Sequence, residues 1–273
     1  MSEIESVAVV GAGFMGTGIA ESVAVAGMPV VVRDVDEASL ARAVRGGKLD
    51  DEHARAARDR IELTTHLKAI GQADLVVEAV PEDERLKLSV MEAIAGVARP
   101  DAIVASNTSS IPIAELAQAV HAPSRVLGLH FFSPVPVMML VEIVVALDTS
   151  EETIARSRRF IERLGKRPIE TKDRSGFIVN MLLVPYLMAA VRMYEEGFAS
   201  REDIDNGMKL GCGHPMGPLT LCDFIGLDVL YAVCDSLYEE FKRDEYAPPP
   251  LMKRMVASGR LGRKSGRGFY EYG

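Results

Sequence analysis

Residues 7–20 read VAVVGAGFMGTGIA, which joins a short β-branched run to a helical pattern through the glycine spacing GxGxxG. Gly11, Gly13 and Gly16 permit a tight turn, close approach of the backbone to a diphosphate, and close packing of helix on strand. The free amides at the start of the helix favour an anion. The stretch predicts a βα unit that binds a dinucleotide through these glycines and through Phe14 and Met15 between them.

Asp34 ends the next apolar strand, about 20 residues beyond the glycines. A carboxylate there accepts hydrogen bonds from both ribose hydroxyls and repels the 2′-phosphate of NADP, so NAD is the predicted cofactor. Ligands on open α/β sheets bind at the carboxyl ends of the strands. Glu78, Glu82 and Asn107 stand at or just beyond such ends, as cofactor contacts or as helix caps and surface groups.

The remaining pattern predicts an α/β class, with a Rossmann-type doubly wound sheet followed by an all-α C-terminal domain. Helical patterns alternate with β-branched runs, a parallel-sheet signature. These runs lie at 7–10, 30–32, 75–80, 102–106, 126–132 and 141–147. Apolar residues at helical spacing then occupy 177–197, 201–211, 217–242 and 248–258. We expect an NAD-binding domain over 1–174 and a substrate and dimerisation domain over 175–273, joined within 166–175.

Composition narrows the class of protein. The 273 residues are 48% hydrophobic and 26% charged, as in ordinary globular proteins, and the formal charge of −8 disfavours nucleic acid or an anionic membrane as partner. The N-terminus lacks a basic leader pattern, and the apolar stretch 177–194 carries polar residues and is short for a membrane span. We expect a cytoplasmic protein without a membrane segment.

Cys212, Cys222 and Cys234 lack the spacing of a zinc site. Buried thiols in a reducing compartment are therefore expected, and no metal site is predicted.

His130 is the histidine that the pattern places at the end of a strand, within HFFSPVPVMMLVEIV at 130–144. A histidine among apolar residues is often a structural group. However, a strand that ends on the cofactor side, a loop interrupted by Pro134 and Pro136, and a carboxylate at Glu142 together offer a base and its orienting partner. This arrangement predicts acid–base chemistry at His130.

Seven motifs, in order and at matching spacings, resemble the 3-hydroxyacyl-CoA dehydrogenase family over essentially the whole chain. They are GAGFMGTGIAE, VVEAVPED, SNTSS, HFFSPVPVMMLVEIV, SGFIVN, GHPMGP and GRKSGRGFYEY. The resemblance implies an NAD-dependent oxidoreductase that interconverts 3-hydroxyacyl and 3-oxoacyl thioesters, with a 3-hydroxybutyryl-CoA-like substrate. It also implies a homodimer formed through the C-terminal domain, in which 177–194 and 217–241 are the apolar segments.

By matching motif, the resemblance implies that His130 and Glu142 form the catalytic pair. It further implies that Ser109 and Asn180 contact the substrate. The cofactor contacts that it implies are Asp34, Glu82, Lys87 and Asn107.

The chain departs from the family pattern where the thioester carrier would bind. After Asp34 there is room for one short helix at 37–44, where the family has a longer arm, although Lys48, Arg55 and Arg58 remain nearby. Ser133, Met139, Met181 and Met188 replace asparagine, lysine, arginine and a polar residue. Since methionine is adaptable packing material, repacking without functional change is one interpretation.

The other interpretation is a hydroxyacyl group tethered to an acyl carrier protein, such as a glyceryl unit in polyketide extender-unit biosynthesis. A carrier protein is acidic and would need a basic docking surface. The candidates are Arg260, Arg263, Lys264 and Arg267.

Two other classes share features of this sequence. A structural, crystallin-like NAD-binding protein would not require both His130 and Glu142. Hydroxy-acid dehydrogenases that use a lysine base place this lysine on the first helix of the second domain, where the present chain has Asn180 and no lysine.

Overall fold

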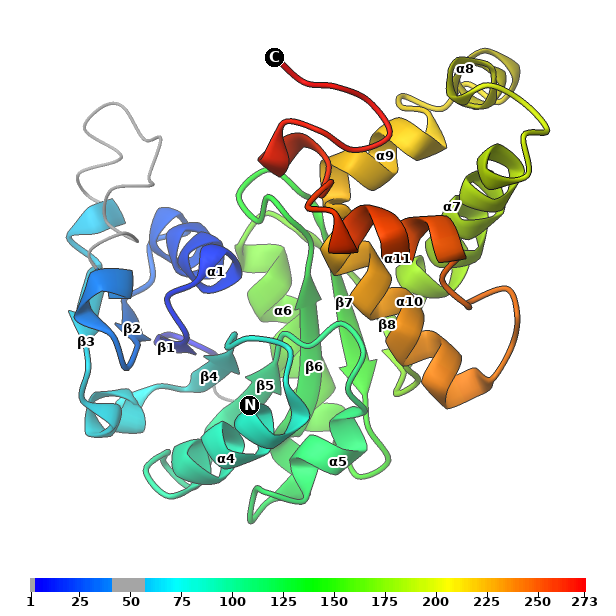
Figure 1. Ribbon diagram of the computed structural model, residues 1–273. Helices are drawn as coiled ribbons and strands as arrows, with labels where there is room; N and C mark the ends of the chain where they lie inside the picture. The colour runs from blue at the N-terminus through cyan, green and yellow to red at the C-terminus, as the bar shows by residue number, and fades with distance from the viewer. Residues whose placement is uncertain (1–2, 41–56) are drawn as a thin grey trace. The chain divides into compact units, whose positions relative to one another are not determined.

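The computed structural model describes residues 3–40 and 57–273, drawn in Figure 1. The chain divides into two compact units, Met1–Arg174 and Ser175–Gly273. The expectations placed on Lys48, on Arg55 and on most of the helix at 37–44 lie outside the described residues. Arg58 is described and exposed.

The first unit contains an eight-stranded sheet in the order β3-β2-β1-β4-β5-β6-β7-β8. Neighbouring strands are parallel, except that β6 and β7 are antiparallel. The strands are β1 (Val7–Val10), β2 (Val30–Arg33), β3 (Ile61–Thr64), β4 (Leu75–Glu78), β5 (Ile103–Ser106), β6 (Val126–Phe131), β7 (Leu140–Val145) and β8 (Arg167–Lys172). The predicted Rossmann-type class is confirmed, but β7 and β8 run opposite to the other strands, which the prediction of a parallel sheet did not include.

The two outermost strands were not predicted. β3 reads IELT and β8 reads RPIETK, and both keep partly exposed side chains because each has a neighbour on one edge alone. Such mixed polar sequences lack the apolar run that marks a strand covered on both faces. β8 occupies most of 166–175, the segment that the sequence indicated as the junction between the two domains.

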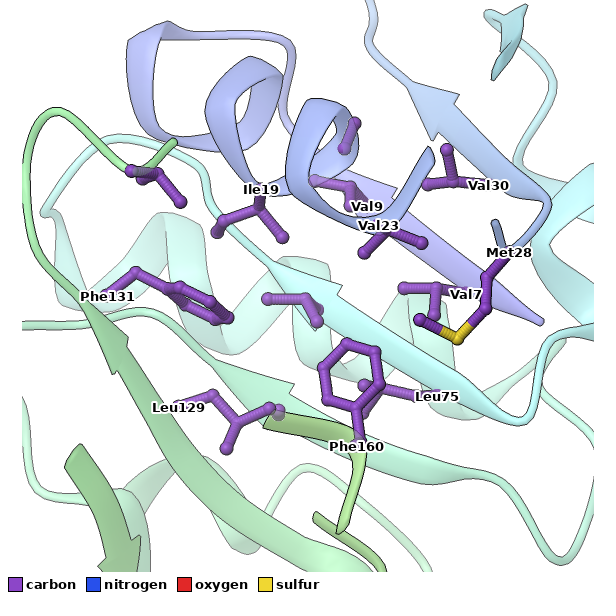
Figure 2. Packing of buried hydrophobic residues seen from close by; sticks show 14 of the residues in the cluster. Val7, Val9, Ile19, Val23, Met28, Val30, Leu75, Leu129, Phe131 and Phe160 are labelled. Carbon is purple, nitrogen blue, oxygen red and sulfur yellow. The ribbon is translucent and has the colours of Figure 1, made fainter. Parts of the chain in front are cut away.

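Helices cover the sheet, and the core lies between them and the central strands. Figure 2 shows Ile19 and Val23 of α1 (Phe14–Val25) among the side chains of Val7 and Val9, with Phe160 of α6 in the same cluster. The other helical elements are η1 (Leu67–Gln72), α4 (Glu84–Ala95), α5 (Ile113–Ala117), η2 (Pro123–Arg125) and α6 (Glu151–Arg163). Because the central strands are buried on both faces, the polar groups that matter gather at the strand ends.

The second unit is helical, as predicted. Its elements are α7 (Val179–Glu195), α8 (Arg201–Gly211), α9 (Pro218–Ile225), α10 (Leu227–Phe241), α11 (Pro250–Ala257) and η3 (Arg263–Ser265). The segment 217–242, which has helical spacing, forms two helices, because Gly226 at φ 101° separates α9 from α10. Glycine adopts this conformation without the steric cost that a side chain would bring.

Two buried carboxylates organise the second unit. Asp205 accepts hydrogen bonds from the amides of Leu219 and Thr220, at 2.7 and 3.0 Å, at the start of α9. Asp223 accepts from the amides of Phe269 and Tyr270, both at 2.9 Å, and so holds the C-terminal GRGFYEY segment. The C-terminal tail, which contains several basic residues and glycines, is thus packed as part of the second unit.

The structure also shows the burial of the three cysteines and the lengths of the apolar helices. Cys222 and Cys234 are buried as expected, but Cys212 is exposed because α8 ends just before it. Within 3–40 and 57–273, no helix combines the length and the apolar character that a membrane crossing needs.

Replacement of Ile19 by alanine tests the packing of α1 on the sheet. Ile19 is fully buried, so Ile19→Ala should lower the free energy of unfolding by about 2–5 kcal/mol through lost burial and a residual cavity. Urea unfolding followed by circular dichroism measures this loss. Val25→Ala, in the same helix but 59% exposed, is the matched control and should change stability little. Equal effects of the two variants would contradict the described packing.

Candidate functional site

The glycine turn between β1 and α1 forms the first part of the site. Gly11 has φ +109°, and a Cβ added there would stand 2.6 Å from the carbonyl oxygen of Ala79. A Cβ on Gly16 would stand 1.9 Å from the carbonyl oxygen of Gly11, whereas one on Gly13 would meet nothing within 4 Å. The turn therefore packs tightly against the protein at Gly11 and Gly16, whereas the space next to Gly13 is open.

The helix N-terminus behind this opening suits an anion. Gly13 is the N-cap of α1 and supplies no side-chain hydrogen bond to the first turn. The first amides of a helix lack intrahelical partners, and the helix dipole makes them attractive to negative charge. Phe14 is 72% exposed beside the opening, while Met15 packs against the core. The residues present fit the diphosphate of a dinucleotide.

Asp34 stands next to this turn, just past the end of β2. Its Oδ2 accepts a hydrogen bond of 2.6 Å from the amide of Ala12, and its Oδ1 accepts one of 3.1 Å from the amide of Asp36. These contacts hold the carboxylate at the edge of the glycine turn. A ribose whose diphosphate lies above Gly13 would meet this carboxylate.

A buried ion pair lies under the ends of β4 and β5. The Lys87 ammonium donates to Oε1 of Glu78 at 2.7 Å and to the carbonyl of Val80 at 3.1 Å. The other Glu78 oxygen accepts from the hydroxyl of Ser106 at 2.5 Å. Lys87 is 1% exposed and Glu78 is fully buried. Since buried charges are tolerated when they are paired and hydrogen-bonded, this cluster forms a fixed base beneath the site.

Glu82 sits above this ion pair and shapes the loop after β5. Its Oε2 lies 3.4 Å from the Lys87 ammonium. Its Oε1 accepts from the Thr108 hydroxyl at 2.6 Å and from the amides of Ser109 and Ser110 at 2.8 and 3.1 Å. Burial alone would raise the pKa of Glu82, but Lys87 and these hydrogen bonds lower it below the ordinary value. The carboxylate is thus held ionised, and the loop is fixed around it.

The loop brings Ser109 to His130. The Ser109 hydroxyl lies 3.1 Å from Nε2 of His130, and Oε2 of Glu142 lies 2.7 Å from Nδ1. His130 is 5% exposed and Glu142 is fully buried. A carboxylate can accept but not donate, so Glu142 favours the tautomer with its proton on Nδ1 and leaves Nε2 as the basic nitrogen.

The strand arrangement creates this pair. His130 of β6 and Glu142 of β7 are direct partners across the antiparallel ladder. Residue Glu142 stands near the beginning of β7, which runs back from the edge where β6 ends. A reversed strand therefore puts an early residue of β7 beside a late residue of β6, at the edge that carries the glycine turn.

The two asparagines have different settings. The side-chain oxygen of Asn107 accepts from the amide of Phe131 at 2.9 Å, which ties the end of β5 to the end of β6. Asn180 is half-buried in the first turn of α7, in the second unit. The structure thus brings Ser109, His130 and Glu142 together in one unit and sets Asn180 in the other.

The sequence did not predict that several residues of this cluster contribute to the site. Ser106, Thr108 and Ser110 belong to the motif SNTSS, but the motif indicated only Asn107 and Ser109 as site residues. A signal for the ion pair was available, because Glu78 stands in a run of apolar residues that would be buried on both faces. A carboxylate in such a strand needs a partner, and Lys87 follows on the next helix.

Two known family profiles match the chain, one in each unit. The profile described as "3-hydroxyacyl-CoA dehydrogenase, NAD binding domain" matches residues 6–174. The profile described as "3-hydroxyacyl-CoA dehydrogenase, C-terminal domain" matches residues 176–272. Together these matches cover nearly all of both units.

Individual proteins are similar over the full length. A 3-hydroxybutyryl-CoA dehydrogenase of Mycobacterium tuberculosis is 50% identical, covering 98% of this chain and 99% of that protein. The mitochondrial hydroxyacyl-coenzyme A dehydrogenase of Sus scrofa is 41% identical, covering 98% and 91%. The crystal structure of (S)-3-hydroxybutyryl-CoA dehydrogenase PaaH1 from Ralstonia eutropha has a TM-score of 0.93 at 44% identity, covering 99% and 100%.

Asp34→Asn tests cofactor discrimination. The amide oxygen can still accept from the Ala12 amide, so the contact with the glycine turn is kept, whereas the acceptor for the Asp36 amide and the negative charge are lost. A charge-assisted hydrogen bond contributes about 1.5–3 kcal/mol, so NADH affinity should fall about tenfold or more. NADPH should bind better than it does to the wild-type protein, as fluorescence titration of both cofactors would show. Glu37→Gln, at a nearby exposed position, is the control, and unchanged discrimination in Asp34→Asn would refute this role.

The lowered pKa of Glu82 predicts a particular dependence of stability on pH. A carboxyl whose folded pKa lies below its unfolded value of 4.5 stabilises the fold above that value. This contribution disappears as the pH falls through the folded pKa. The difference in free energy of unfolding between wild type and Glu82→Gln should therefore be largest near neutral pH and shrink in acid. Urea titrations across this range measure it, with exposed Glu92→Gln as control; a difference that grows in acid would contradict the assignment.

Proposed function

The chain belongs to the 3-hydroxyacyl-CoA dehydrogenase family, and on that premise we propose that His130 is the acid–base residue of its reaction, with Glu142 as its partner. The reaction is the NAD-dependent interconversion of a 3-hydroxyacyl and a 3-oxoacyl thioester, with a 3-hydroxybutyryl-CoA-like substrate. The observation that carries the proposal is the Ser109–His130–Glu142 chain of contacts, at 3.1 and 2.7 Å.

The role of each residue follows from its atoms. In the oxidation, Nε2 of His130 accepts the proton of the substrate 3-hydroxyl as the C–O double bond forms. In the reduction, the imidazolium returns this proton to the oxygen. Glu142 orients the ring through Nδ1 and stabilises its charged form. Ser109, which already reaches Nε2, donates a hydrogen bond to the substrate oxygen, and we assign the same function to Asn180.

NAD supplies the acceptor or donor of the hydride when it is bound. The glycine turn would hold its diphosphate at the start of α1, and the Asp34 carboxylate would accept hydrogen bonds from the ribose hydroxyls. Glu82 and Asn107 lie just beyond the carboxyl ends of β4 and β5, where ligands of open α/β sheets bind, and would contact the bound cofactor there. Lys87 is buried beneath Glu82, which supports a role for it through the position and charge of that carboxylate.

We propose coenzyme A, rather than a carrier protein, as the handle of the thioester. Three of the four basic residues considered for docking a carrier protein, Arg263, Lys264 and Arg267, have partners within the second unit. Lys264 pairs with Asp228 at 2.6 Å, and Arg267 pairs with Glu271 at 3.3 Å. The guanidinium of Arg263 lies over the ring of Phe224. These contacts give the basic tail a structural function.

We also propose a homodimer formed through the second unit, and a cytoplasmic location. Large apolar side chains of 177–194 and 217–241 are exposed, which is typical of an interface. They include Leu182 at 73%, Val229 at 48% and Phe224 at 46%. All three cysteines are free thiols, in keeping with a reducing compartment.

Replacement of His130 tests the proposed function. With acetoacetyl-CoA and NADH, His130→Gln should lower kcat by about 10²–10⁴-fold, because a positioned acid–base group is lost. The decrease in NADH absorbance measures turnover. Titration of the same variant with NADH should show binding close to that of the wild type.

Exposed His121→Gln is the matched control and should keep full activity. Retained turnover in His130→Gln with intact NADH binding would overturn the assignment. A higher kcat/KM for the same acyl group on a carrier protein than on coenzyme A would overturn the proposed handle.

A further inference from the structure

Lys166 is a buried cation that the chemistry described so far does not use. It is 7% exposed, and it follows Gly165 at the end of α6, where its amide bonds the carbonyl of Ile161 at 3.2 Å. Burial lowers the pKa of its ammonium. Placing an ammonium in a buried position is costly unless hydrogen bonds compensate. The hydrogen-bond partners of the Lys166 ammonium therefore show which part of the fold it stabilises.

The ammonium donates two hydrogen bonds to the loop between β6 and β7. Nζ of Lys166 donates to the carbonyl of Val135 at 2.5 Å and to the carbonyl of Met138 at 2.8 Å. The next residue, Arg167, donates its amide to the carbonyl of Met139 at 2.7 Å. One short segment thus contacts the loop at three carbonyls, those of Val135, Met138 and Met139.

The loop is compact, and one of its sides is anchored. The amides of Val137 and Met138 both donate to the carbonyl of Pro134 at 3.0 Å. Val135 is 1% exposed, and a Cβ on Gly18 of α1 would come within 2.9 Å of its side chain. The anchored side faces the helix that begins at the dinucleotide turn.

The loop also carries large apolar side chains that are exposed to solvent. Val137 is 71% exposed, Met139 is 55% exposed and Met138 is 38% exposed. The loop begins just after His130 and Phe131 and returns just before Glu142. These three side chains, which we call the apolar lip, therefore belong to the loop that joins the strands of His130 and Glu142.

We propose that Lys166 is a positioning residue that holds the apolar lip in place to receive the acyl group of the substrate. This inference rests on the proposed function, which supplies an acyl group next to His130. The ammonium bridges two carbonyls that flank Val137, so its removal frees the backbone of the lip without touching His130 or Glu142. The expected effect is on binding of the acyl substrate more than on the chemical step.

Lys166→Met tests the proposal, because it keeps the length of the side chain and removes the charge and the donors. The KM for acetoacetyl-CoA should rise about tenfold, as expected when apolar contacts with a substrate are lost. The kcat and the KM for NADH should stay near their wild-type values. Hydrogen exchange of the Val137 and Met138 amides should accelerate. Lys172→Met, at an exposed lysine of β8, is the matched control and should change none of these values.

Two further variants separate the outcomes. Lys166→Arg keeps the charge and the donors and should retain a lower KM than Lys166→Met. Val137→Ser alters the lip alone and should also raise the KM, which decides the question if Lys166→Met does not fold. An unchanged KM in Val137→Ser, or an unchanged KM in a folded Lys166→Met protein, would overturn the proposal. Loss of the proposed function itself would appear separately, as wild-type protein without turnover or as an active His130→Gln variant.

Discussion

The antiparallel pairing of β6 and β7 is the constraint on which the candidate site depends. In a sheet of parallel strands, residues at the carboxyl ends meet at one edge, and the beginning of the next strand lies at the other edge. The reversal of β7 brings Glu142 directly opposite His130. Because the two side chains are buried partners on adjacent strands, the backbone ladder fixes the distance between carboxylate and imidazole. The acid–base pair is thus a product of strand direction.

The pair is supported from the other side by a chain of buried polar contacts. Lys87 joins Glu78 to Glu82, and Glu82 collects the hydroxyl and amide donors of the loop that carries Ser109. Each charge in this chain has a partner, which is the condition under which buried polar networks stabilise a single arrangement. Ser109 is therefore presented to His130 by a loop whose shape is set before substrate arrives. Such preorganisation lowers the cost of aligning reacting groups.

The loop between β6 and β7 is also held in place by one charged side chain, but here the charge is positive. The Glu82 carboxylate binds backbone amides with its negative charge, whereas the buried Lys166 ammonium binds backbone carbonyls with its positive charge. In both places one charged side chain fixes a loop at the edge of the sheet. Loops at such edges carry the function of α/β proteins, and an internal charge can fix them without regular secondary structure.

The sequence by itself determined the elements whose cause is local. Glycines at the turn into α1, β-branched runs in the central strands and helical spacing after residue 177 each act over a few residues, so they predicted the Rossmann-type unit and the helical unit. The motifs also pointed to His130, Glu142 and Ser109. Only the tertiary structure decided the reversal of β7, the two edge strands and the break at Gly226. It also decided which carboxylate Lys87 meets and which loop Lys166 holds. These features join residues distant in sequence through strand order and direction, and neither leaves a periodic signal along the chain.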